Sequence, residues 1–135
     1  MPTDLPDYTK KIAITVTVET ESVPIAQTTE TPVVQLGRYT GTDTTYQSVV
    51  KWTVSASKGG VLKEVSMESD NYAKTRFKLL IGGTAYFTDK TILAPLAVPF
   101  ADVSLSAAIE VEVQAKSSDG TSIIVDGLIS GKEIG

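Results

Sequence analysis

The sequence predicts an all-β fold, either a β-sandwich or a barrel. About seven or eight short segments alternate apolar with polar residues, and turns rich in Gly, Asp and Ser separate them. The best candidate for a helix, residues 103–113, has apolar spacing that fits a strand at least as well. A chain of 135 residues has the usual size of one domain, so we expect a single core built from residues 1–135.

The N-terminal part combines one clear strand with segments that have no period. Residues 11–20 (KIAITVTVET) alternate without a slip, and the apolar face carries Ile12, Ile14, Val16 and Val18. Residues 21–32 (ESVPIAQTTETP) contain two prolines and follow neither a helical nor a strand period. We therefore expect a strand with one buried face, and extended arm or loop segments over residues 1–10 and 21–32.

The middle of the chain predicts two hairpins. Residues 49–56 place Trp52 among valines on one face, which makes this tryptophan a core residue, and the turn 58–60 (KGG) should join them to a second strand. In that second strand Val61, Val65 and Met67 share a face, although Lys63 also falls on it. Gly82 and Gly83 should form the turn of the other hairpin, between residues 75–81 and 84–87.

The C-terminal part predicts three more extended segments. Residues 92–100 (ILAPLAVPF) are apolar but contain Pro95 and Pro99, which favours an edge strand or an extended crossing segment. Residues 109–116 alternate cleanly and predict a half-buried strand. The last strand, residues 122–130, contains Gly127, which we expect to mark a β-bulge.

Composition argues against several functional classes. The sequence has no cysteine and no histidine, so it lacks thiolate metal ligands and the commonest general base. Its net charge of −4, with interleaved signs, gives no positive field for nucleic acid. No apolar run approaches the ~20 residues of a membrane span, and the first residues do not resemble a signal peptide. We expect no enzymatic activity, no cofactor, and neither nucleic acid nor membrane as a partner.

One loop is a candidate ligand site. It carries a hydroxyl, a carboxylate, an amide and an aromatic ring on Ser69, Asp70, Asn71 and Tyr72, which could bind a sugar or help to hold calcium. The same residue types also make turns by bonding their own backbone, and this interpretation is the stronger one. The aspartates elsewhere do not follow the spacing of a calcium loop, so no metal site is expected. The basic stripe Lys74, Arg76 and Lys78 is interpreted as a solvent face, with a docking strip as the alternative.

Short motifs in residues 61–135 carry a family resemblance. They are residues 62–66 (LKEVS), 69–72 (SDNY), 74–79 (KTRFKL), 95–100 (PLAVPF), 118–123 (SDGTSI) and 129–133 (ISGKE). This combination resembles the small proteins that decorate or cement the capsids of tailed phages. The resemblance implies a β-sandwich of jelly-roll type with an extended N-terminal arm and no catalytic residues. It also implies assembly in the host cytoplasm, a final place on the capsid surface of the virion, and often a homotrimer.

The resulting hypothesis is a viral structural protein that binds the outside of a phage capsid and stabilises the shell. Its partners would be the major capsid protein and other copies of itself. The residues expected to contact the capsid are Leu5, Tyr8, Val23, Pro24, Ile25 and Pro32. The alternative is a carbohydrate-binding module or a head-fibre or tail receptor-binding domain that uses residues 69–72, and a tail-tube or baseplate sandwich is a third possibility.

Overall fold

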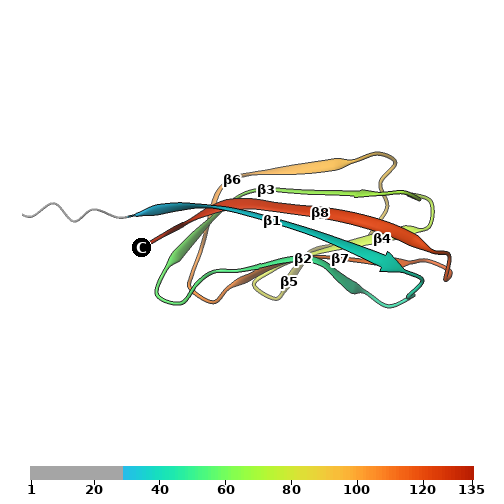
Figure 1. The fold of residues 1–135 in the computed structure, drawn as a ribbon, viewed down its shortest axis with the longest axis horizontal. Helices are drawn as coiled ribbons and strands as arrows, with labels where there is room; N and C mark the ends of the chain where they lie inside the picture. The colour runs from blue at the N-terminus through green and yellow to red at the C-terminus, as the bar shows by residue number, and fades with distance from the viewer. Residues whose placement is uncertain (1–28) are drawn as a thin grey trace, which may run out of the picture.

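The computed structural model describes residues 29–135, which form eight strands and contain no helix (Figure 1). The strands are β1 (Glu30–Gly41), β2 (Gln47–Thr53), β3 (Gly59–Ser69), β4 (Thr75–Ile81), β5 (Thr84–Lys90), β6 (Leu96–Leu105), β7 (Glu110–Ser117) and β8 (Ile123–Ile134). Residues 1–10, the expected strand 11–20 and residues 21–28 lie outside the described part of the chain.

The strands form two antiparallel sheets that stack as a sandwich (Figure 1). One sheet has the order β1-β8-β3-β6 and the other β2-β7-β4-β5. The chain passes between the sheets at every connection except the one from β4 to β5. Two interleaved four-stranded sheets of this kind are the jelly-roll arrangement. The predicted all-β sandwich of jelly-roll type is therefore confirmed.

The core lies between the two inner faces. Strand β7 alternates strictly, with Val111, Val113 and Ala115 fully buried. Phe77 of β4 is also fully buried, and Trp52 is 3% exposed, which confirms its predicted place in the core. Alternate side chains of each strand thus point inward, and the remaining side chains form two outer faces.

One predicted hairpin is confirmed and the other is wrong. Strands β4 and β5 pair through a turn in which Gly82 and Gly83 have φ of 60° and 80°. Strands β2 and β3, which were expected to pair, belong to different sheets. The turn between them, which includes Ser57 with φ of 65°, lets the chain cross from one layer to the other. The apolar faces of β2 and β3 then bury each other across the core instead of lying side by side.

Lys63 and Gly127 both differ from expectation. The pairing register of β3 shifts between Leu62 and Glu64, so Lys63 is the extra residue of a bulge. Leu62 is therefore buried and Val61 faces outward, so Val61 does not share a face with Val65. Gly127 pairs regularly with β1 and β3 and marks no bulge.

Two prolines, Pro32 and Pro99, lie in the edge strands of one sheet. Residues 96–100 lie in β6 at one edge of its sheet, which confirms the edge-strand prediction for this segment. Residues 30–32 were expected to be part of an arm, but they begin β1, and Pro32 pairs opposite Lys132 of β8. Proline is tolerated there because β1 is also an edge strand, where one side of the backbone needs no ladder hydrogen bond.

Candidate binding face

The outer face of the β1-β8-β3-β6 sheet carries apolar side chains. Leu36 of β1 lies opposite Leu128 of β8, which lies opposite Ser66 of β3, which in turn lies opposite Ala97 of β6. Residues directly opposite each other in a sheet share a face, so these four form one row across all four strands. Leu36 is 73% exposed and its neighbour on the same face, Val34, is 61% exposed.

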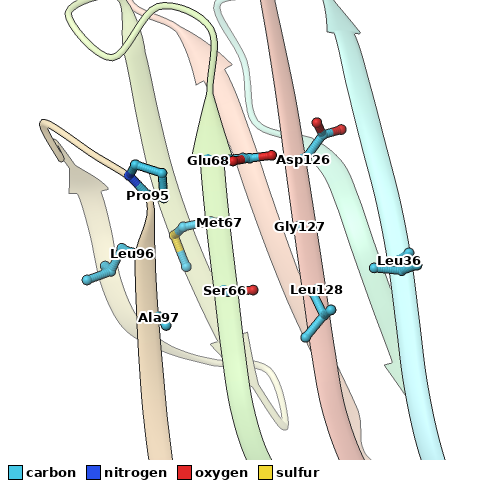
Figure 2. A pocket seen from close by; sticks show the side chains of 10 residues that line it. All are labelled: Leu36, Ser66, Met67, Glu68, Pro95, Leu96, Ala97, Asp126, Gly127 and Leu128. Carbon is cyan, nitrogen blue, oxygen red and sulfur yellow. The ribbon is translucent and has the colours of Figure 1, made fainter.

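A shallow hollow of about 320 Å³ lies on this face (Figure 2). It is lined by Leu36, Ser66, Met67, Glu68, Pro95, Leu96, Ala97, Asp126, Gly127 and Leu128. Figure 2 shows the carboxyl groups of Glu68 and Asp126 at one end, with Leu128, Ser66 and Ala97 farther along the strands.

An ion pair borders the hollow. The guanidinium of Arg38 donates to both carboxylate oxygens of Asp126, from Nε to Oδ1 at 2.7 Å and from Nη2 to Oδ2 at 3.0 Å. This bidentate pair lowers the pKa of Asp126 below its usual value and raises the pKa of Arg38. Because the Arg38 side chain is 63% exposed, its remaining donors face solvent.

The lining of the hollow is mainly apolar, with a few polar groups. It supplies aliphatic side chains, one hydroxyl and two carboxylates. Within the described residues, no group of three or more acidic side chains is placed to hold a metal ion. The same part of the chain contains no helix that is long and apolar enough to cross a membrane. What this face offers a partner is apolar area with a charged border.

Two polar side chains of the candidate ligand loop, those of Ser69 and Asp70, bond within the fold. The Ser69 hydroxyl accepts the backbone N–H of Asn71 at 3.1 Å and lies 2.7 Å from the hydroxyl of Thr75. The Asp70 carboxylate accepts the backbone N–H of Ile124 at 2.8 Å, and Tyr72 packs partly buried against the core. These bonds tie the loop between β3 and β4 to the start of β8. None of residues 69–72 lines the hollow.

The basic stripe is held by its neighbours. Lys74 lies in the turn before β4 and donates to Asp119 at 2.7 Å, and this bond is the main cause of a lowered pKa of Asp119. The Arg76 guanidinium donates to the carbonyls of Ala73 and Thr75.

Tyr46 organises the third basic residue and its surroundings. The ammonium groups of Lys78 and Lys116 lie 5.3 and 4.7 Å from the centre of its ring. Its hydroxyl donates to the carboxylate of Asp89 and accepts the Asp89 N–H, and burial raises the pKa of Tyr46 to about 12. Around Tyr46, the outer face of the β2-β7-β4-β5 sheet therefore carries charged groups that contact its ring, its hydroxyl or one another.

Of the residues expected to contact the capsid, Pro32 lies in the described part of the chain. Leu5, Tyr8, Val23, Pro24 and Ile25 lie outside the described residues, and Pro32 is exposed at the start of β1. The sequence reasoning missed Leu36, Ala97 and Leu128. A signal existed in β8, where Ile124 and Leu128 alternate with buried Ile123, Val125 and Ile129, so that apolar residues occupy both faces.

Comparisons with known proteins identify no family. No protein-family model and no curated protein matches the sequence. Among solved structures, the chain is similar to a chain in the capsid asymmetric unit of cyanophage Pam1. That likeness has 17% sequence identity and a TM-score of 0.48, and covers 82% of this chain and 90% of the other. A likeness at this level establishes neither a family nor a function.

Proposed function

We propose that this protein is a viral structural protein that binds the outside of a phage capsid and stabilises the shell. The observation that carries the proposal is the hollowed apolar outer face of the β1-β8-β3-β6 sheet. Exposed apolar side chains that gather on one face of a folded domain favour a protein contact, because covering them removes apolar area from water. The motifs in residues 61–135 that resemble decoration and cement proteins supply the virion context.

The partner of this face would be the major capsid protein. A ligand that binds the assembled shell and not its free subunits stabilises the assembly by mass action, by about 2.7 kcal/mol per site at a hundred times the dissociation constant. Repeated over many sites, modest contacts would suffice for cementing. The proposal includes a homotrimer at the capsid surface of the virion, assembly in the host cytoplasm, and clamping contacts from residues 1–10 and 21–32.

The sugar-binding alternative finds no specific support in the geometry. The side chains of Ser69 and Asp70 bond within the fold, as described above. An aromatic side chain must be exposed to stack on a sugar ring, and Tyr86 is 58% exposed. It follows the Ile81 end of β4, whereas the loop precedes the Thr75 end, so the two are not neighbours.

The experiment is a binding assay with Leu36→Asp and a matched control. Purified protein is titrated onto capsids of the source phage that lack it, and bound protein is measured by co-sedimentation. We expect Leu36→Asp to weaken binding at least tenfold, since a charge would enter the apolar row. Leu93→Asp makes the same chemical change at a side chain that is 94% exposed outside the hollow, and it should bind within about twofold of the unmodified protein.

Two results would contradict the proposal. Unchanged binding of the Leu36→Asp variant would remove this face from the contact. Quantitative mass spectrometry of purified particles provides the second check, because a decorating protein should be present at a simple ratio to the major shell protein. Its complete absence from particles would overturn a virion role.

A further inference from the structure

Three of the four edge strands in the described part of the chain are irregular. The register of β2 shifts between Ser48 and Val50, and the pairing of β5 shifts twice. Strand β6 contains Pro99 and extra residues opposite the β3 bulge, including Asp102 with φ of 52°. Bulges, prolines and charges of this kind keep an edge from pairing with another strand.

Strand β1 has Pro32 near its start and Arg38 farther along, but no bulge, and the stretch between these two residues lacks such protections. Its 12 residues pair with β8 in one uninterrupted register. Residues 33–37 (VVQLG) carry no charge, and within the described residues no strand pairs with the other side of β1. Every second N–H and C=O along this side is therefore directed away from β8, in a strand long and regular enough to accept a further strand.

The chain contains a segment suited to this edge. Residues 11–20 have unbroken strand alternation, and ten residues extend over about 34 Å, compared with about 40 Å for β1. Residues 21–29 connect the two segments and can reach about 30 Å when extended, so they easily close an antiparallel connection. A segment with this alternation would need a partner in order to form a strand, because isolated strands are not stable in water.

We propose that residues 11–20 pair, in the same molecule, with the edge of β1 that no described strand covers, as an additional antiparallel strand. With Thr20 opposite Glu30, Val16 lies opposite Val34 and Ile14 opposite Leu36. The apolar residues of the segment then share the outer face with the exposed side chains of β1. If the apolar residues of the segment pointed inward instead, they would bury less apolar area. Strand β2 is the edge strand of the facing sheet, and no described strand lies beyond it to cover them.

This additional strand would widen the apolar row that crosses the sheet at Leu36. It requires no capsid, so it can be tested on the purified protein and can fail independently of the proposed function.

Amide hydrogen exchange measured by NMR on the full chain is the first test. The informative amides are those of β1 that do not bond β8. We expect them to be protected, and we expect Val16→Pro to accelerate their exchange at least tenfold, because proline removes a ladder donor and disturbs the strand. Gln27→Pro, in the connection that already contains Pro24, is the control and should leave exchange unchanged. Exchange of these amides at unprotected rates in the unmodified protein would overturn the inference.

Engineered cysteines test the face and the source of the strand, since the chain has no native cysteine. A variant carrying Val16→Cys and Val34→Cys should form a disulfide within one molecule. The control pair, Thr15→Cys with Val34→Cys, should not, because residue 15 faces the other side. A preference for the control pair, a disulfide found only between molecules, or no disulfide within one molecule would each overturn the placement.

Discussion

Replacing Gly131 with alanine should destabilise the fold more than the same replacement at Gly127. Both glycines lie in β8 and face the opposite sheet. A Cβ on Gly131 would lie 2.2 Å from the carbonyl oxygen of Val61 and 3.1 Å from the ring of Trp52. A Cβ on Gly127 would lie 2.8 and 3.1 Å from methyl groups of Val50 and Val49. The obstacle is a backbone carbonyl in the first case and side-chain methyl groups in the second.

The magnitude follows from how far the obstacle must move. A carbon atom normally stays about 3.3 Å or more from a carbonyl oxygen, so alanine at position 131 requires a backbone shift of about 1 Å. Overpacking costs about 1–3 kcal/mol, and the restricted unfolded chain returns about 0.4–1 kcal/mol on a change from glycine to alanine. We therefore expect Gly131→Ala to lower the free energy of unfolding by about 2 kcal/mol, and Gly127→Ala by less than about 1 kcal/mol.

Urea unfolding followed by tryptophan fluorescence measures both values. The sequence has one tryptophan, Trp52, whose buried ring reports on the core directly. The free energies come from the midpoint and slope of each transition, and equal slopes would show that the variants unfold from the same native state. Equal stability of the two variants, or a larger loss at Gly127, would refute the assignment of the Val61 carbonyl as the decisive contact.

Two further changes test contacts that hold the sandwich together. The buried carboxylate of Glu133 accepts N–H groups of Ser55 at 3.1 Å and Trp52 at 3.2 Å, and these bonds lower its pKa below the ordinary 4.5. A carboxylate whose pKa is lower in the folded state stabilises the fold above the unfolded-state pKa, and this contribution is lost as the pH falls through the folded-state pKa. We therefore expect the difference in unfolding free energy between the unmodified protein and Glu133→Gln to shrink on acidification. Urea unfolding at several pH values measures this difference, and a difference that does not change with pH would contradict the prediction. Asp70→Ala should cost about 1 kcal/mol by removing the acceptor for Ile124, and a change in sugar binding without a change in unfolding would instead favour a ligand loop.

The sequence predicted local features of the fold well. Alternation identified the strands around Phe77 and Val113 because the burial of one face leaves a period of two in any sandwich. The failed hairpin has the opposite cause. A Gly-rich turn looks the same whether the next strand pairs beside the first or crosses to the facing sheet, and β2 in fact pairs with β7, about sixty residues later. The misfit of Lys63 on an apolar face was a local sign of the bulge.

The candidate binding face was beyond sequence reasoning for a related reason. Leu36, Leu128 and Ala97 come from strands far apart in the chain, and only the order β1-β8-β3-β6 places them in one row. The prediction concentrated instead on the loop at residues 69–72 and on segments outside the described residues. Polar loop residues attract attention in a sequence, but here their hydrogen bonds close the loop onto the fold.

The two outer faces differ in what it costs to cover them, and this difference sets the expected orientation of the domain on a partner. On the β2-β7-β4-β5 sheet, Lys116 is paired with Asp89 at 3.3 Å and both meet the Tyr46 network, so a partner would have to dehydrate charges that are already satisfied. On the other sheet, covering Leu36 and its neighbours yields about 25 cal/mol per Å² of apolar area, and the charged groups that border the hollow are the Arg38–Asp126 pair and the Glu68 carboxylate. A partner therefore gains most by lying against the β1-β8-β3-β6 sheet, which leaves the charged sheet toward solvent, where its ionised side chains remain hydrated.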